Sequence, residues 1–176
     1  MLVSKMYETN NEKFIYFAYG SNMLNRRING MERATSAVSI GIGFVQGYKL
    51  NFNKESIDKS GKCDIEQTDN ATDKVYGVLF QIDKKDKLKL ERSEKGYKEV
   101  TVDVLTSLCK YSAVTYVALK KKSGLLPYHW YKAIVICGAI EHDLPYEYIE
   151  WLRTFHSQND PDVNRQSKNE SILFPR

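Results

Sequence analysis

The stretch FAYGSN, residues 17–22, is decisive because three apolar or aromatic residues give way at once to glycine, serine and asparagine. The preceding run, KFIYFAY at residues 13–19, is rich in β-branched and aromatic residues and ends at Gly20. This pattern is typical of a buried strand that runs into a turn. The next run, NMLNRRI, indicates a short helix with Asn22 as its N-cap. The sequence therefore predicts a strand, a tight turn and a helix.

The glycine in this turn is compatible with a binding role. Gly20 has no side chain, so it can adopt backbone angles that other residues avoid and leaves room for a ligand against the main chain. The amides of Ser21, Asn22 and Met23 would then point outward at a helix start, where partial positive charge holds a carboxylate or an oxyanion. Ordinary turn chemistry, with Asn22 only capping a helix, explains the same residues. Rossmann and P-loop sites are excluded, because neither glycine motif follows this strand.

The chain length and composition predict one globular domain. We expect that domain at residues 13–156 of the 176, followed by a polar, mobile tail at residues 157–176. No run of about 18 apolar residues is present to form a bilayer helix. The start, MLVSKMYETN, lacks the apolar core of a secretory signal. We therefore expect a cytoplasmic protein without a membrane partner.

Charge and ligand-forming residues argue against two further classes of protein. The net charge is +4, but the lysines are spread along the chain and interleaved with acids in KKDKLKLERSEKGYK, so we expect no nucleic-acid partner. The three cysteines are isolated and odd in number, which favours a reducing compartment over a disulfide framework. The three histidines form no local ligand pair, so we expect no metal site.

The middle of the chain predicts two long strands and a short strand between them. Residues 36–53 alternate small or polar residues with apolar ones around three glycines, which indicates a long bent strand. Residues 54–74 are dominated by polar and turn residues, so we expect an exposed loop with a short strand around Ile65. VYGVLFQI at residues 75–82 predicts a strong strand, followed by a surface helix capped by Asp83.

The last third of the predicted domain contains a hairpin and two helices. The alternating runs at residues 97–106 and 113–119 predict two strands that pair through residues 109–111. WYKAIVICGAIEH at residues 130–142 and DLPYEYIEWLRTF at residues 143–155 carry apolar residues at helical intervals. Two amphipathic helices are therefore predicted.

A candidate catalytic acid lies between the surface helix and the hairpin. Glu94 precedes Gly96 in KLERSEKGYKEV. Most surface glutamates are only solvated charges, and the surrounding acids and lysines favour that interpretation when the residue is considered alone.

Three segments together resemble the γ-glutamylcyclotransferase family: YFAYGSNM near the start, the acid and glycine after VYGVLF, and YKAIVICGAIEHDLPYEYIEWL. The resemblance covers roughly residues 14–155. It implies an α+β fold, a compact mixed β-barrel flanked by short helices. It also implies an enzyme without metal or cofactor that converts γ-glutamyl compounds to 5-oxoproline and a released amine or amino acid.

The resemblance assigns roles to particular residues. Glu94 matches the catalytic carboxylate that moves a proton from the attacking α-amine to the departing nitrogen. Tyr131 matches an active-site tyrosine, and Tyr97 matches another tyrosine near the acid. The substrate-binding segment corresponds to Tyr16, Phe17, Ala18, Tyr19, Gly20, Ser21 and Asn22.

The sequence departs from the family pattern next to the catalytic acid. Lys95 intervenes before Gly96, where the family usually has glycine directly after the acid. Glu91, three residues earlier, is therefore the competing acid. The segment from Cys63 to Ile65 stands where the family tends to have small residues and a hydrophobe, so a changed wall there would alter the leaving group accepted.

Several functions remain open from the sequence. The substrate is a small γ-glutamyl amino acid or a γ-glutamylamine, or the enzyme trims a γ-glutamyl protecting group from a larger product that the loop at residues 54–74 contacts. A non-catalytic module that binds a small ligand on the same fold is the alternative from another class. Related enzymes are often dimers, so the resemblance adds a homodimer to the expected partners.

Overall fold

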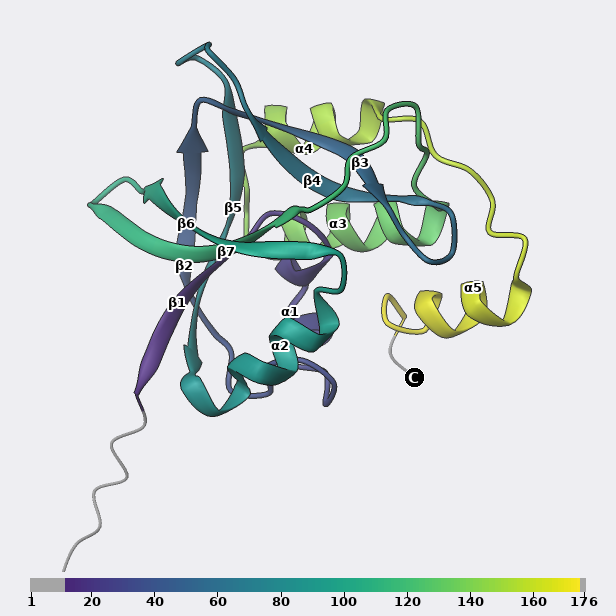
Figure 1. Cartoon of the computed structure of the whole chain (residues 1–176), viewed down its shortest axis with the longest axis horizontal. Coiled ribbons are helices and arrows are strands. Elements are labelled where there is room, and N and C mark those ends of the chain that lie inside the picture. Colours follow the sequence, from purple (N-terminus) through teal and green to yellow (C-terminus); the bar gives the residue numbers. More distant parts are fainter. Residues whose placement is uncertain (1–11, 175–176) are drawn as a thin grey trace, which may run out of the picture.

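The computed structural model describes residues 12–174, which form a closed β-barrel beside a two-stranded sheet (Figure 1). The barrel order is β1-β5-β2-β6-β7, and β3 pairs with β4. The strands are β1 (Lys13–Ala18), β2 (Val38–Gln46), β3 (Tyr48–Glu55), β4 (Gly61–Gln67), β5 (Lys74–Asp83), β6 (Tyr97–Leu105) and β7 (Lys110–Ala118). The helices are η1 (Ser21–Met23), α1 (Asn25–Ile28), η2 (Lys84–Asp86), α2 (Lys87–Ser93), α3 (His129–Glu141), α4 (Tyr146–Thr154) and α5 (Val163–Glu170).

This architecture confirms the predicted α+β class and the β-barrel flanked by short helices. The polar start that bears on a secretory signal, residues 1–10, lies outside the described residues, as do the last two residues of the predicted tail. Within residues 12–174, no helix is both long enough and apolar enough to cross a membrane.

Strand β5 lies between β1 and β2 in the barrel. It pairs antiparallel with β1 on one edge and with β2 on the other. A Cβ atom on Gly77 would lie 2.3 Å from the carbonyl oxygen of Ala18, so this close approach of β5 to β1 requires glycine. On its other edge β1 meets β7 in parallel at Tyr16 and Val114, which closes the barrel. The end of β1 is therefore held from two sides.

The structure confirms one predicted strand arrangement and corrects two others. The hairpin of β6 and β7 is confirmed, with Leu105 opposite Lys110 at its tight end. The loop predicted at residues 54–74 is too long, because β3 runs to Glu55 and β4 spans Gly61–Gln67, whereas the short strand predicted around Ile65 is confirmed as part of β4. The single long strand predicted at residues 36–53 is also wrong, since it divides at Gly47, whose φ of 75° makes the turn into β3.

The β3–β4 hairpin has a buried side that its largely polar sequence does not indicate. Cys63, Asp64 and Ile65 are all buried, although the surrounding sequence is polar. The Asp64 carboxylate accepts a hydrogen bond from the Ala118 amide at 2.8 Å, and the Lys121 ammonium lies 2.8 Å from its other oxygen. A buried carboxylate needs such partners. Asp64 therefore fixes β4 to the end of β7 and so fixes the position of Cys63.

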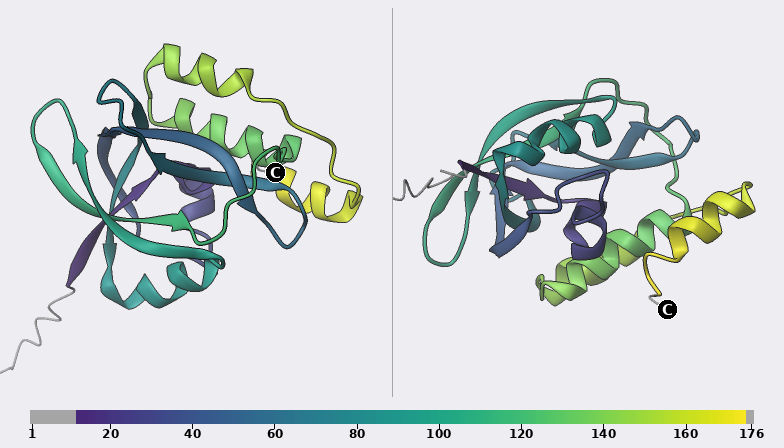
Figure 2. Two further views of the ribbon diagram at one scale, coloured as in Figure 1. Left: turned by 45° about the horizontal axis from the view of Figure 1, so that its top comes forward. Right: turned by 90° about the horizontal axis from the view of Figure 1, so that it is seen from below.

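The two predicted helices, α3 and α4, are confirmed and pack side by side (Figure 2), but only α4 is clearly amphipathic, because α3 is apolar on most of its surface. Helix α3 also packs on η1, the turn that follows β1. A Cβ atom on Gly138 would lie 2.6 Å from the Leu24 amide nitrogen and 2.8 Å from the Met23 Cβ. Glycine at position 138 thus lets α3 pack directly against the backbone of the turn, which fixes the position of the turn.

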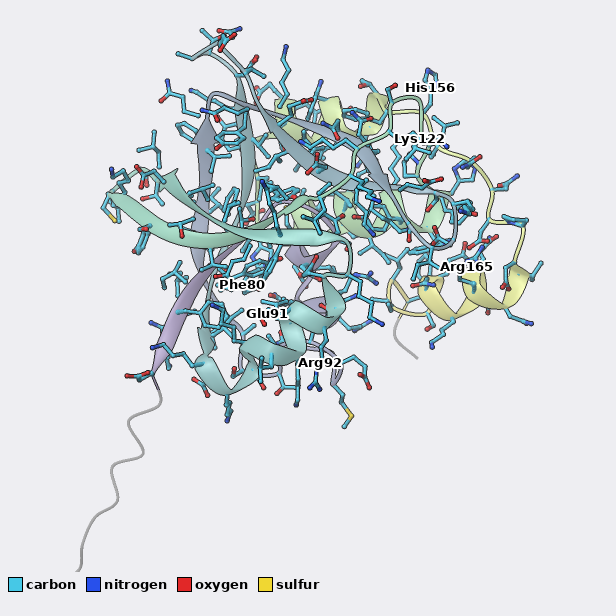
Figure 3. All side chains as sticks on the ribbon, viewed as in Figure 1. Phe80, Glu91, Arg92, Lys122, His156 and Arg165 are labelled. Atoms are coloured by element: carbon cyan, nitrogen blue, oxygen red, sulfur yellow. The ribbon has the colours of Figure 1, made fainter. Side chains whose placement is uncertain are left out.

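The predicted mobile tail is not a structureless segment, because residues 163–170 form α5. Asp160, immediately before this helix, is buried and accepts hydrogen bonds from Trp130 Nε1 at 2.9 Å and from Arg165 Nε at 2.7 Å. Figure 3 labels Arg165 on α5. The polar composition gave no sign of this helix, because α5 has no buried residue and the charged pair of Asp160 and Arg165 holds its start beside α3, while Ile172 and Leu173 after the helix pack against the core.

We predict that Asp160→Asn lowers the free energy of unfolding by about 1.5–3 kcal/mol, the usual range for hydrogen bonds to a charged group. The hydrogen bonds from Arg165 lower the pKa of Asp160 to about 2. The carboxylate therefore stabilises the fold above its ordinary pKa, and this stabilisation is lost as the pH falls through about 2. Urea denaturation of both proteins at several pH values measures the difference.

The matched control for this variant is Asp162→Asn. Asp162 caps α5 by accepting a hydrogen bond from the Arg165 amide, and asparagine caps equally well. Equal stability of the Asp160 variant and the wild type at neutral pH would contradict the role given to the cluster.

Candidate active site

The turn after β1 requires a glycine for space rather than for an unusual φ. Gly20 has φ −121°, but a Cβ atom there would lie 2.9 Å from the Cys63 Cβ. The Met23 amide donates to the Gly20 carbonyl at 3.0 Å. Within the described residues, the amides of Ser21 and Asn22 donate no hydrogen bond. The turn therefore presents two free amides, instead of the three predicted from the sequence.

Asn22 does not cap a helix, contrary to the sequence prediction. Gly20 and Leu24 occupy the N-cap positions of η1 and α1, and neither makes a side-chain cap. The Asn22 side chain is buried and its Nδ2 donates to Glu94 Oε1 at 2.7 Å and to the Tyr16 hydroxyl at 3.1 Å. The Asn22 Oδ1 atom is buried without a partner in the described chain. The inward-facing side chain of Asn22 thus connects the turn after β1 to Glu94.

Glu94 directly follows the last residue of α2 and begins a tight turn into β6. The Tyr97 amide donates to the Glu94 carbonyl at 3.1 Å, and Gly96 has φ 83°, which glycine adopts without strain. The extra Lys95 is exposed in this turn and leaves the Glu94 carboxylate directed at Asn22. The departure from the family spacing is therefore accommodated in the turn.

The Glu94 carboxylate has a raised pKa although several cations lie near it. Burial raises its pKa above the ordinary value of 4.5, against the opposing influence of Arg33, the Asn22 hydrogen bond, Arg27 and Lys54. Glu94 Oε2 accepts no hydrogen bond from the described residues. One carboxylate oxygen is thus held by Asn22, and the other is available to a ligand.

Tyrosines from three strands, the turn after β1 and helix α3 surround this carboxylate. The Tyr97 hydroxyl donates to the Cys63 carbonyl at 2.7 Å, and the Cys63 amide donates to the Tyr131 hydroxyl at 3.1 Å. The Tyr19 hydroxyl donates to the Tyr116 carbonyl. Burial raises the pKa values of these tyrosines, so their hydroxyls stay neutral at physiological pH.

These groups surround a cavity of about 300 Å³, including its open side, which we call the inner pocket. The pocket is lined by Tyr16, Tyr19, Gly20, Ser21, Asn22, Cys63, Glu94, Tyr97, Tyr116 and Tyr131.

The structure brings together most of the residues predicted for the site, and leaves three outside the inner pocket. Phe17 and Ala18 are buried in the barrel wall and do not line the pocket. Glu91 is exposed on α2, 3.9 Å from the Lys87 ammonium, and is also absent from the lining (Figure 3). Of the two acids considered from the sequence, only Glu94 reaches the pocket.

A second cavity of about 520 Å³, including its open side, adjoins the inner pocket and shares five residues with it. We call this cavity the basic vestibule because cations dominate its wall. Its lining comprises Ser21, Asn22, Arg27, Arg33, Lys54, Ser56, Lys62, Ser93, Glu94, Lys95, Tyr97 and Tyr131.

Sequence reasoning missed Tyr116 and the vestibule cations. Tyr116 lies in a strand that alternates like any other, and the cations come from separate parts of the chain, so no local pattern marks them. Cys63 was singled out only as a changed wall position, and it does line the pocket. Burial raises its thiol pKa to about 12, so it is no thiolate nucleophile at neutral pH. Among the described residues, no cluster of three metal-ligating side chains is present.

Comparison with known proteins decides the family. Residues 74–152 match the AIG2-like family. The γ-glutamylcyclotransferase of Homo sapiens is 32% identical over 152 residues, which cover 81% of this chain and 78% of that protein. The Mus musculus γ-glutamylcyclotransferase is 33% identical over 153 residues, with coverage of 81% and 78%. The chain belongs to the γ-glutamylcyclotransferase family.

A solved structure confirms this relationship in three dimensions. A γ-glutamyl cyclotransferase that is 28% identical superposes with a TM-score of 0.80, over 91% of this chain and 99% of its own. The chain is therefore an enzyme of the γ-glutamylcyclotransferase type, and not a ligand-binding module on a similar barrel.

We predict that Gly20→Ala impairs catalysis by this γ-glutamylcyclotransferase-type enzyme and that Cys63→Gly partly restores it. The added methyl group would meet the Cys63 Cβ at 2.9 Å and displace the turn. Removing that Cβ relieves the contact. The double variant should therefore lose less than the sum of the two single losses, by about 0.5–3 kcal/mol when the kcat/KM values are converted to activation free energies, as is usual for neighbouring residues. Additive losses in the double variant would contradict the steric explanation.

Proposed function

We propose that this enzyme converts a γ-glutamyl amino acid or a γ-glutamylamine to 5-oxoproline and the free amino acid or amine, with Glu94 as the general acid and base. The observation that carries the proposal is the hydrogen bond of 2.7 Å that holds Glu94 to Asn22, beside a turn with two free amides. The acid and the amides share one pocket. Cyclisation of a glutamyl group needs both.

The reaction begins with proton removal from the substrate α-ammonium group. The raised pKa of Glu94 suits this step, because a base is most effective when its pKa lies near the operating pH. The neutral α-nitrogen then attacks the γ-carbonyl carbon of the same glutamyl group and closes a five-membered ring. The C–N bond forms as the carbonyl becomes a tetrahedral oxyanion.

The amides of Ser21 and Asn22 are suited to that oxyanion, because each donor aimed at it contributes about 3 kcal/mol in comparable acyl-transfer sites. The tetrahedral intermediate collapses when the bond to the leaving nitrogen breaks. Glu94 returns its proton to that nitrogen, and the ring nitrogen loses its second proton to the departing amine or to water, so that neutral 5-oxoproline is formed and Glu94 ends the cycle ionised. Among the described residues, no other carboxylate lines the inner pocket.

The tyrosine walls support the ring closure by restricting the glutamyl chain. The inner pocket is narrow, about 300 Å³ including its open side, and three of its five tyrosine hydroxyls make hydrogen bonds with main-chain carbonyls or amides. A narrow pocket favours the folded substrate conformers in which the amine faces the carbonyl. Such positioning supplies up to roughly 7–11 kcal/mol in intramolecular reactions.

We predict that Glu94→Gln lowers kcat at least about 100-fold, the lower range for loss of a general acid–base group. Glutamine can still accept the Asn22 hydrogen bond but cannot take up a proton. Because burial raises the Glu94 pKa, ionisation of this group opposes folding as the pH rises, so the variant should be at least as stable as the wild type at neutral pH. Measuring 5-oxoproline release from γ-glutamyl-alanine, with a thermal melt, checks both outcomes.

The control for Glu94→Gln is Glu91→Gln, an exposed acid on the same helix. Its turnover should stay unchanged and its stability within about 0.5 kcal/mol of the wild type. Undiminished turnover in the Glu94 variant, with loss in the Glu91 variant, would transfer the role to Glu91.

We also predict a characteristic pH dependence. Activity should be lost as the pH falls through the Glu94 pKa, and the midpoint of this acid limb in kcat/KM should lie above 4.5. Arg33 is the charge that most lowers this pKa, so Arg33→Gln should move the midpoint to higher pH. A midpoint that does not respond to Arg33→Gln would show that another group titrates.

A further inference from the structure

The basic vestibule carries four cations without an acidic partner: Arg27, Arg33, Lys54 and Lys95. Within residues 12–174, no carboxylate lies at ion-pair distance from any of them. They come from α1, from the loop after α1, from β3 and from the turn after α2. The fold therefore gathers dispersed positive charges at the mouth of the pocket.

The fifth vestibule cation is neutralised by its own neighbour. Lys62 Nζ lies 2.9 Å from the Asp58 carboxylate and donates to the Ser60 hydroxyl at 2.6 Å. Glu94 is the single carboxylate in the vestibule lining. Four unpaired cations and one acid leave a net charge of +3 on this wall. Like charges gathered in a partly enclosed space repel one another, so an anionic ligand is favoured there.

Arg27 and Lys54 are both partly withdrawn from solvent. Arg27 Nε donates to the Ser21 hydroxyl at 2.9 Å, and Lys54 Nζ lies 5.1 Å from the centre of the Tyr97 ring. Burial lowers the pKa of both groups, that of Arg27 to about 10, so both remain charged at neutral pH. These two cations are held close to the inner pocket and are poorly screened by solvent.

The inner pocket itself contains no cation, so the vestibule is where a leaving group beyond the glutamyl nitrogen would lie. A neutral leaving amino acid brings one α-carboxylate to this wall, which leaves most of the positive charge without a partner. We propose, given the cyclotransferase function above, that the preferred leaving group carries an acidic group in addition to its α-carboxylate.

This charge arrangement orders the substrates left open by the sequence. Donors with an acidic leaving amino acid should react best, those with a neutral one less well, and γ-glutamylamines with a cationic end least. This order follows from the positive charge of the vestibule wall alone, because every donor presents the same γ-glutamyl group to Glu94. The acidic group is either a carboxylate or a phosphate, since both pair with arginine and lysine.

The decisive experiment compares donors of matched shape. The wild-type enzyme is assayed for 5-oxoproline release from γ-glutamyl-glutamate against γ-glutamyl-glutamine, and from γ-glutamyl-O-phosphoserine against γ-glutamyl-serine. At least one acidic donor should show a kcat/KM about fivefold or more above its neutral partner, the effect of one favourable ion pair. This ratio should fall as the salt concentration rises. Equal values within both pairs would overturn the proposal.

Variants of the vestibule test which charges act. Lys54→Gln and Lys95→Gln should each lower the ratio of acidic to neutral kcat/KM, mainly through KM for the acidic donor. Lys98→Gln is the matched control, because Lys98 is exposed on β6 and does not line the vestibule. A ratio that survives in the double variant Lys54→Gln/Lys95→Gln would overturn the assignment to this wall.

The same assays separate this proposal from the function on which it rests. Release of 5-oxoproline from neutral and acidic donors at equal rates refutes the preference and leaves the cyclotransferase function standing. Absence of 5-oxoproline from every donor refutes the function and, with it, the preference.

Discussion

The hydrogen bond between Asn22 and Glu94 is the interaction on which the site depends. It joins the turn after β1 to the end of α2, two points 72 residues apart in the sequence. The turn is fixed from two sides, since β1 is paired on both edges and α3 packs against the turn. The donor is a neutral amide, so it holds the carboxylate without supplying a charge. A lysine or arginine in its place would lower the Glu94 pKa strongly and weaken it as a base.

Strand β4 fixes another wall of the inner pocket. The Cys63 backbone lies between two tyrosine hydroxyls, accepting from Tyr97 and donating to Tyr131. Asp64, the next residue, fixes the strand to Ala118. The Cys63 side chain also limits the space available at Gly20, so the position of β4 helps to set the width of the pocket. Neutral side chains with satisfied hydroxyls complete the wall, which leaves Glu94 as the only carboxylate within it.

The sequence predicted those features that have a local physical signal. β-Branched and aromatic alternation marks the barrel strands, and glycine after a buried strand marks the turn. Glu94 could be selected only through resemblance, because its burial depends on elements far along the chain. The strand around Ile65 was predicted, but its hairpin with β3 was missed because polar residues surround its buried positions in the sequence. Helix α5 was missed because it has no buried apolar residue and is attached beside the charged Asp160. The vestibule has no local signal, as its cations converge only in three dimensions.

In the mechanism proposed above, one carboxylate serves two opposite proton transfers, and the vestibule bears on how it could do so. Burial raises the Glu94 pKa, while Arg33, Arg27 and Lys54 lower it, so its basicity is a balance between desolvation and nearby positive charge. An acidic leaving group bound among those cations would neutralise part of that charge and raise the Glu94 pKa in the complex. The bound substrate would thereby strengthen the base that must take its α-ammonium proton. As the leaving group departs with its negative charge, the cations would again favour the ionised carboxylate, which is the state required for the next cycle.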